Sequence, residues 1–316
     1  MQANKIRLMF LGDIVGKAGR KAVEKYISGL SENKPDFILA NVENASHGFG
    51  LTKKNYNELL SYGIDAFTSG NHIWDKREIF TYIEEADKLV RPINYPQGTK
   101  GVGYRIFEKD GYKVGVINVL GRTFMGLYDA PWQLIEDAIN EIKKETPIIV
   151  IDIHAEATAE KICMAMYYAK MGISGVFGTH THVQTADERI YENCCAYISD
   201  AGFCGDRNSV IGMEYESSVN RLITAIPDRL EVASSGETQI NGVVVTIDVL
   251  SGCAEDITRI NEIINISEEN IIMKGWGSEG RFTYPHIIFW WRIFTWKNRR
   301  YSNRCGTWSN RNYRSR

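Results

Sequence analysis

Long apolar segments are absent from this sequence of 316 residues. No run approaches the roughly 18 uninterrupted apolar residues of a membrane-spanning helix, so a membrane span is not expected. Residues 1–5 lead straight into a predicted strand, without the apolar core and small-residue cleavage site of a signal peptide. From these features we expect a cytoplasmic protein.

Two common motifs of cysteine and glycine are also missing. The six cysteines form no Cys-x-x-Cys pair and no spacing typical of a disulfide framework. We therefore expect free thiols in a reducing compartment, each serving as a small buried apolar side chain. Gly12, Gly16 and Gly19 lack the Gly-x-Gly start of a dinucleotide-binding loop, because Ile14 stands where the second glycine belongs.

A charge excess of either sign is missing from the chain as a whole, whose formal net charge is −2. The balance hides an asymmetry, because residues 265–316 carry about +7 and residues 1–264 about −9. The same last fifth holds five of the seven tryptophans. We predict a folded domain over 1–264 and a basic, tryptophan-rich, poorly ordered extension over 265–316.

Strands and helices are expected to alternate along the first 264 residues. The apolar run 147–153 is typical of a strand that is buried on both faces. Expected strands cover 6–11, 37–40, 66–68, 103–108, 112–118, 147–153, 173–177, 188–191, 195–199 and 241–249. Expected helices cover 17–32, 52–62, 76–85, 131–144, 156–171 and 214–223. This order predicts an α/β fold rather than an all-β or all-helical one.

Metal-ligating side chains follow several of these strands. His180 and His182 come directly after the strand 173–177, and imidazoles at i and i+2 can reach one metal ion or a close pair. In open α/β sheets, ligands bind in the crevice beyond the carboxyl ends of the strands. We expect these histidines to converge with the other polar groups at strand ends, which are Asp13, Glu43, Asn44, Asn71, His72 and His154.

The chemistry of this set predicts a centre of two metal ions. Imidazole nitrogens together with oxygens of Asp, Glu and Asn favour iron, manganese or zinc over calcium or magnesium. Two such ions, about 3.5–4 Å apart, can hold a bridging hydroxide for in-line attack on a phosphoryl group. Glu43 is the predicted bridging carboxylate. His72 is predicted to stay outside the metal shell as the general acid, with Asp75 orienting its ring.

Five ordered motifs resemble the YmdB-type branch of the calcineurin-like metallophosphoesterases, and the similarity covers residues 5–262. The commoner pattern of that superfamily begins Asp-x-His and has Gly-Asp in its second motif, whereas this chain has Val15 and Glu43-Asn44, as the branch does. The motifs are Gly12-Asp13-Ile14-Val15-Gly16, Asn41-Val42-Glu43-Asn44, Gly70-Asn71-His72-Ile73-Trp74-Asp75, His154-Ala155-Glu156-Ala157-Thr158 and Gly178-Thr179-His180-Thr181-His182 with its continuation to Asp187.

The resemblance implies a four-layer α/β/β/α sandwich with a di-iron or similar dinuclear centre. It also implies phosphodiesterase activity on 2′,3′-cyclic nucleotides, a small-molecule substrate that the residues alone do not specify. His72 is the implied proton donor. The implied ligands are Asp13, Glu43, Asn44 and His182 for one metal, and Glu43, Asn71, His154 and His180 for the other.

Simpler interpretations exist for single residues. Asp13 could cap the following helix, Asn44 could be a turn residue, and His154 could be a hydrogen-bonded core histidine. His47, which follows the second motif, is expected only to line the mouth of the site.

Two other functions compete with the cyclic phosphodiesterase. One is a phosphomonoesterase or protein phosphatase on the same scaffold. The other is a regulatory RNA-binding protein with a vestigial metal site, in which the extension contacts RNA or a membrane surface. A frame-shifted or fused gene end would also explain the extension, and a homo-oligomer is compatible with the sequence.

Overall fold

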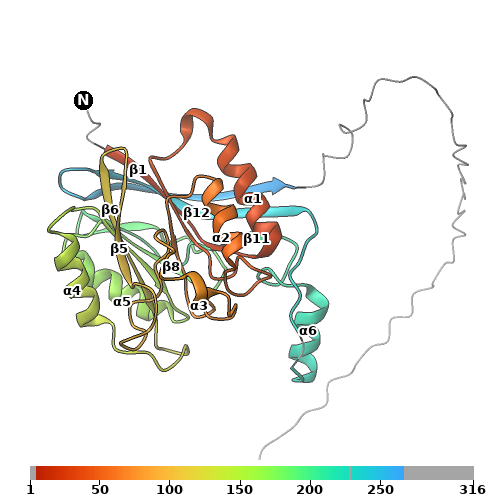
Figure 1. Cartoon of the computed structure of the whole chain (residues 1–316). Coiled ribbons are helices and arrows are strands. Elements are labelled where there is room, and N and C mark those ends of the chain that lie inside the picture. Colours follow the sequence, from red (N-terminus) through yellow and green to blue (C-terminus); the bar gives the residue numbers. More distant parts are fainter. Residues whose placement is uncertain (1–4, 228, 267–316) are drawn as a thin grey trace, which may run out of the picture. The chain divides into compact units, whose positions relative to one another are not determined.

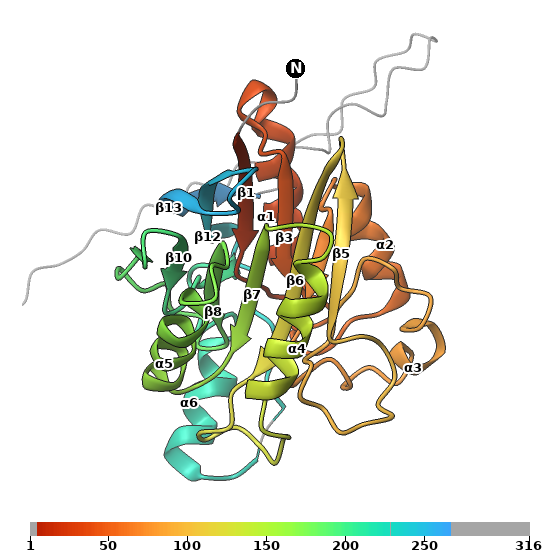
Figure 2. The same cartoon turned by 90° about the vertical axis from the view of Figure 1, so that its left-hand side faces the viewer.

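The computed structural model describes residues 5–227 and 229–266, which form two stacked β-sheets with helices on the outer faces (Figures 1 and 2). The first sheet has the order β2 (Asp13–Ile14), β11 (Phe203–Asp206), β12 (Glu237–Asp248), β1 (Lys5–Leu11), β3 (Phe37–Asn41) and β4 (Ala66–Thr68), and β13 (Ala254–Asn265) pairs with β12. The second has the order β5 (Tyr104–Lys109), β6 (Tyr112–Leu120), β7 (Ile149–His154), β8 (Gly175–Thr179), β10 (Cys195–Ile198) and β9 (Arg189–Tyr191).

The helices cover the two outer faces. The first sheet is covered by α1 (Gly16–Gly29), α2 (Lys53–Ser61) and the short α3 (Ile79–Tyr82). The second is covered by α4 (Trp132–Ile142) and α5 (Thr158–Ala169), which lie in front of β6, β7 and β8 in Figure 2. A 3₁₀ turn, Ser31–Asn33, follows α1, and α6 (Tyr215–Thr224) follows β11.

Alternating side chains explain the layers. On β1, Leu8 and Phe10 point into an apolar core shared by both sheets, where the Phe10 ring centroid lies 5.2 Å from that of Phe177 on β8. The intervening Met9 and Leu11 join a second apolar cluster beneath α1 and α2. β7 alternates in the same way between the shared core and a third cluster beneath α4 and α5. The expected four-layer α/β/β/α sandwich is confirmed.

Parallel strands bring the predicted ligands to one edge. In the first sheet β1, β3 and β4 run parallel, and in the second β6, β7, β8 and β10 run parallel. The predicted metal ligands follow β1, β3, β4 and β8, except for His154, which is the last residue of β7. These segments meet where the carboxyl ends of the two sets of strands adjoin.

Most predicted elements are present, but β11 and β13 were not expected. β11 has only four residues and includes Gly205, so its run of apolar residues is too short to indicate a strand. β13 is rich in charged residues, and most of its side chains are at least partly exposed, so its apolar alternation is weak. The predicted helix 76–85 is mostly turns, because hydrogen bonds such as Ile79 N to Lys76 O span three residues rather than four.

The expectation that all cysteines are free thiols is wrong for one pair. Cys194 and Cys253 form a disulfide across 59 positions, with their Cα atoms 4.2 Å apart. The pairing depends on the fold, because the two residues precede β10 and β13, and a main-chain hydrogen bond joins these segments. Cys195 and Cys204 are buried free thiols as expected, whereas the free thiol of Cys163 is exposed.

The predicted extension falls almost wholly outside the described residues, which end at 266. Its predicted poor order and its RNA or membrane contacts concern residues that lie outside that range. Within 5–227 and 229–266, no helix combines the length and apolarity that a membrane crossing requires.

Candidate metal centre

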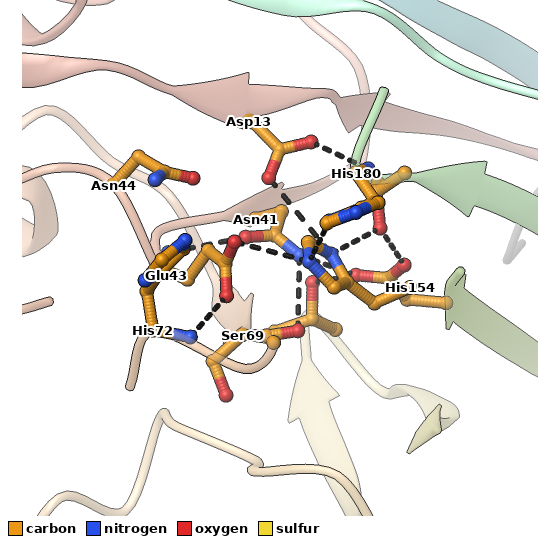
Figure 3. A network of polar contacts seen from close by, with 12 residues as sticks. Asp13, Asn41, Glu43, Asn44, Ser69, His72, His154 and His180 are labelled. Carbon is orange, nitrogen blue, oxygen red and sulfur yellow. Dashed lines mark hydrogen bonds and ion pairs between the residues drawn. The ribbon is translucent and has the colours of Figure 1, made fainter. Parts of the chain in front are cut away.

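Three potential metal ligands converge on one nitrogen of a fourth, His154 (Figure 3). Its Nε2 lies 3.0 Å from Glu43 Oε1, 3.1 Å from His180 Nδ1 and 3.2 Å from Asn71 Oδ1. Ligand atoms of Glu43, His154 and His180 all lie within 4.8 Å of one another. The crowding of lone pairs at one point favours a cation between them.

A second group of ligands lies around Asp13. Its Oδ1 is 3.8 Å from His182 Nε2 and 3.9 Å from His154 Nδ1. Asp13 Oδ1 and Asn44 Oδ1 are buried and have no hydrogen-bond partner among residues 5–227 and 229–266, although the Asn44 amide nitrogen donates to Gly48 O at 2.8 Å. Buried oxygens without donors are rare in folded proteins unless a water or an ion satisfies them. These residues therefore fit a metal site.

The hydrogen bonds of each imidazole select the nitrogen that faces the centre. His182 Nδ1 donates to the carbonyl of Ile211 at 2.8 Å, which leaves Nε2 directed at Asp13. Thr179 Oγ1 donates to Asp152 Oδ1 at 2.7 Å and therefore accepts from His154 Nδ1 at 2.9 Å, which leaves Nε2 of His154 for the centre. Such partners orient ligating histidines and set their tautomer.

Asp152 supports His154 from inside β7. Its carboxylate is buried and also accepts from Asn41 Nδ2 at 2.9 Å and from the Thr68 hydroxyl, so it links β7 to β3 and β4. Burial raises the pKa of Asp152 to about 6. In the sequence, Asp152 lies within the predicted apolar strand 147–153. Its role depends on neighbours that only the fold supplies.

A buried ion pair holds the turn that carries His180 and His182. Both histidines have positive φ, 100° and 62°, a conformation that non-glycine residues rarely adopt. Lys161 Nζ lies 2.9 Å from Asp200 Oδ2 and donates to Thr179 O at 2.8 Å. The same Asp200 oxygen accepts from the main-chain nitrogen and the hydroxyl of Thr181. These contacts stabilise the strained turn from both sides.

Glycine is required at position 70 by the packing of the ligands. A Cβ atom there would lie 2.3 Å from Glu43 Oε2 and 2.5 Å from His154 Nε2. Since no side chain fits in that space, the Gly70-Asn71-His72 segment can lie directly against Glu43 and His154.

Burial and mutual charge set the pKa values of the ligands. Burial opposes ionisation of Glu43, but His154 overcomes this effect and holds the Glu43 pKa at about 2. Burial also opposes protonation of His154, yet Glu43 and Asp13 raise its pKa to about 9. Burial and the nearby His154 lower the His180 pKa to about 3. The positive charge of protonated His154 thus balances the buried Glu43 carboxylate, and a bound metal cation would supply this charge in place of the proton.

His72 lies at the rim of the same centre. Its main-chain nitrogen donates to Glu43 Oε2 at 2.8 Å, and its ring Nδ1 donates to Asp75 Oδ2 at 2.9 Å. The side chain is 31% exposed. It lines a cleft of about 350 Å³ together with Glu43, Asn44, Phe49, Glu156, His180, Thr181, His182, Ile211, Met213 and Leu230.

The structure brings the eight predicted site residues into one region, in two adjoining groups around Glu43 and Asp13. His180 and His182 do not act as neighbours on one strand face, because both follow the end of β8 and reach different partners. The supporting roles of Asp152, Thr179, Lys161 and Asp200 were not predicted from the sequence. Their signal in the sequence is weak, because Asp152, Thr179 and Lys161 are polar residues in otherwise apolar elements and Asp200 lies in the loop after β10.

Solved structures define the class of this protein. A phosphatase from Mycoplasma pneumoniae matches with a TM-score of 0.76 at 32% identity, over 84% of this chain and 95% of that one. A hypothetical protein from Thermus thermophilus matches with a TM-score of 0.74 at 32% identity, over 82% and 99% of the two chains. With the metal-binding group at the strand ends, this fold is that of a metallophosphoesterase, and the chain is an enzyme of that class.

The chain belongs to the YmdB-like protein family, whose sequence profile matches residues 9–260. It is 45% identical to a 2′,3′-cyclic-nucleotide 2′-phosphodiesterase from Bacillus subtilis over 256 residues, which are 81% of this chain and 96% of the relative. It is 35% identical to a putative phosphatase/phosphodiesterase from Mycoplasma pneumoniae over 255 residues, 78% of this chain and 89% of the relative. The resemblance inferred from the five motifs is confirmed.

Proposed function

We propose that this protein is a metal-dependent phosphodiesterase that hydrolyses 2′,3′-cyclic nucleotides in the cleft beside His72. The Bacillus subtilis relative with that name supports the substrate class, since it is 45% identical and covered almost completely. The observation that carries the proposal is the convergence of Glu43, Asn71 and His180 on His154 Nε2.

The ligand sets predicted from the motifs remain the proposed ones. Asp13, Glu43, Asn44 and His182 would hold one ion, and Glu43, Asn71, His154 and His180 the other. Bound ions would polarise the phosphoryl group and activate the attacking water. The donor set of imidazole nitrogens and oxygens suits iron, manganese or zinc. We propose iron as the resident metal.

His72 is the proposed proton donor. Its Nδ1 proton is engaged by Asp75, so Nε2 is the nitrogen available to the departing oxygen. Water oxygen would bond to phosphorus while the bond from phosphorus to the 2′ oxygen breaks, and His72 would deliver the proton that this oxygen requires. The product would be a nucleoside 3′-phosphate.

The apolar wall of the cleft suits a nucleoside. Phe49, Met213 and Leu230 line it along with the polar ligands, and the Phe49 ring packs edge-on against His72 with centroids 4.9 Å apart. A base or sugar can rest on such a surface while the phosphate meets the polar floor.

A panel of three substrates tests the proposal. Protein purified without added metal is analysed for bound ions and is then assayed with 2′,3′-cyclic AMP, 3′,5′-cyclic AMP and a phosphomonoester. We expect about two transition-metal ions per chain and preferred hydrolysis of 2′,3′-cyclic AMP. Failure to hydrolyse that substrate with metal bound would refute the proposed specificity.

A phosphomonoesterase or protein phosphatase is the second candidate. The related structure from Mycoplasma pneumoniae, described as a phosphatase, favours it. Preferred turnover of the phosphomonoester in the same panel would support this function. The RNA-binding alternative with a vestigial site depended on residues 265–316, most of which lie outside the described residues.

A cytoplasmic location stays a prediction. The Cys194–Cys253 disulfide does not support it, because the expectation of a reducing compartment rested on free cysteines. Assembly into a homo-oligomer also stays a prediction. Size-exclusion chromatography with light scattering measures the oligomeric state, and thiol titration of protein taken from cells measures how many of its cysteines are free.

A further inference from the structure

Two further cavities lie near the cleft at the metal centre and share lining residues with it or with each other. A cavity of about 370 Å³ adjoins it at Leu230, which lines both. A third cavity of about 270 Å³ adjoins the second at Lys17, Ala18 and Ser234, which line both of these. We call the second and third cavities together the basic groove.

The lining of the basic groove is strongly cationic. Its lining includes Lys17, Lys21, Arg229 and His47. Among the described residues that line the groove, Glu231 is the one acidic residue. Lys17 and Lys21 are four residues apart on α1 and therefore share one face of the helix. Within the described ranges, neither ammonium group has an ion-pair or hydrogen-bond partner. An anion entering the groove would meet two uncommitted positive charges.

The wall between the cleft and the groove is tied to the metal centre. Asn44 donates to Gly48 O at 2.8 Å, so the loop that carries His47 is joined to a proposed ligand. A Cβ atom on Gly48 would lie 2.8 Å from Val232 Cγ2, which shows how closely this loop packs on the strip that lines the groove. One loop thus connects Asn44, which lines the cleft, to His47, which lines the groove, and the two hollows lie side by side.

We propose that the substrate is an RNA strand whose 3′ end carries a 2′,3′-cyclic phosphate, and that the basic groove binds the nucleotides on the 5′ side of this terminal nucleotide. This inference rests on the proposed function and names its substrate class. A terminal cyclic phosphate forms when a ribose 2′-hydroxyl attacks the neighbouring phosphodiester, so further backbone phosphates lie only on its 5′ side. A free mononucleotide is accommodated by the cleft alone and has no further phosphate that could reach the groove. The backbone phosphates of an RNA strand, in contrast, are anions that the lysines of the groove can bind.

The test compares substrates of different length on the full chain with its metal. The kcat/KM for 2′,3′-cyclic AMP is measured beside that for adenosine oligoribonucleotides of two, four and eight residues that end in the same cyclic phosphate. We expect the ratio of oligonucleotide to mononucleotide kcat/KM to rise with length. This ratio should fall roughly sevenfold between about 50 and 200 mM salt if two lysines contact phosphates. The estimate uses a slope of log affinity against log salt of about −0.7 per neutralised phosphate.

The double variant Lys17→Gln/Lys21→Gln should remove most of the preference and its salt dependence. The matched control is Lys54→Gln/Lys170→Gln, which makes the same charge change at two exposed lysines outside the groove and should keep the preference.

Three results would overturn the inference. In the first, the wild-type ratio is near one while 2′,3′-cyclic AMP is hydrolysed, so the proposed function stands and the RNA substrate does not. In the second, the preference survives Lys17→Gln/Lys21→Gln, which assigns RNA binding to another surface. In the third, neither substrate is hydrolysed by metal-loaded protein, and the proposed function fails with the inference.

Discussion

His154 and His72 belong to the same site, but their surroundings differ. The His154 side chain is fully buried, and Thr179, Asp152 and Lys161 support it and the adjoining turn through a chain of hydrogen bonds. The His72 side chain is 31% exposed and has one ring hydrogen bond, to Asp75, which is 44% exposed itself. A metal ligand needs a fixed position, whereas a proton donor needs access to substrate and solvent. The contrast in burial matches the two proposed roles, metal ligand for His154 and proton donor for His72, and leads to four predictions.

The largest effect should come from His154→Ala. This change removes the nitrogen on which Glu43, Asn71 and His180 converge, so bound metal should fall from about two ions to one or fewer. Turnover should fall by more than the roughly 10⁴ that loss of a general acid can cost. Metal analysis and turnover of 2′,3′-cyclic AMP measure both effects. A variant that keeps two ions per chain would contradict the assigned centre.

His72→Ala should lower turnover by about 10²–10⁴ at unchanged metal content. The contact of residue 72 with Glu43 uses the main-chain nitrogen, so the substitution leaves that contact in place. A diester with a nitrophenolate leaving group needs less proton donation and should therefore lose much less activity. Equal losses on both substrates would argue against the general-acid role, as would loss of metal.

Thr179→Val should weaken metal binding by about 10- to 100-fold, the usual cost of removing a partner that orients a ligating histidine. The valine keeps the shape of threonine but cannot accept from His154 Nδ1 or donate to Asp152. Metal affinity is measured by competition with a chelator. Thr179→Ser retains the hydroxyl and should restore most of the affinity. If serine and valine behave alike, the hydroxyl has no orienting role.

Asp75→Asn should have the smallest effect, a loss of turnover of no more than about fivefold. Ion pairs between exposed groups are worth about 0.2–1 kcal/mol, and both partners here are partly exposed. Metal content should not change. If the loss equals that of His72→Ala, the two residues act as one unit and the contrast between the buried and exposed histidines is wrong.

The residues at strand ends were predictable for a physical reason. A short apolar run that stops at Asp13, Glu43 or His154 indicates a buried strand that delivers a polar group to the sheet edge, and parallel strands deliver their groups to the same edge. The four-layer fold followed from the motifs as well. The disulfide, β11 and β13 were missed, because their signals are weak along the chain and depend on neighbours far away in sequence.

The amino-acid sequence alone determined which candidate ligands this protein offers and in what order along the chain, because apolar runs and the polar residues at their ends are local features. Only the tertiary structure decided which ring nitrogen each histidine presents. His154 and His182 present Nε2 and His180 presents Nδ1. The choice depends on Thr179, Ile211 and the strained turn after β8, and long-range packing alone holds these groups in position.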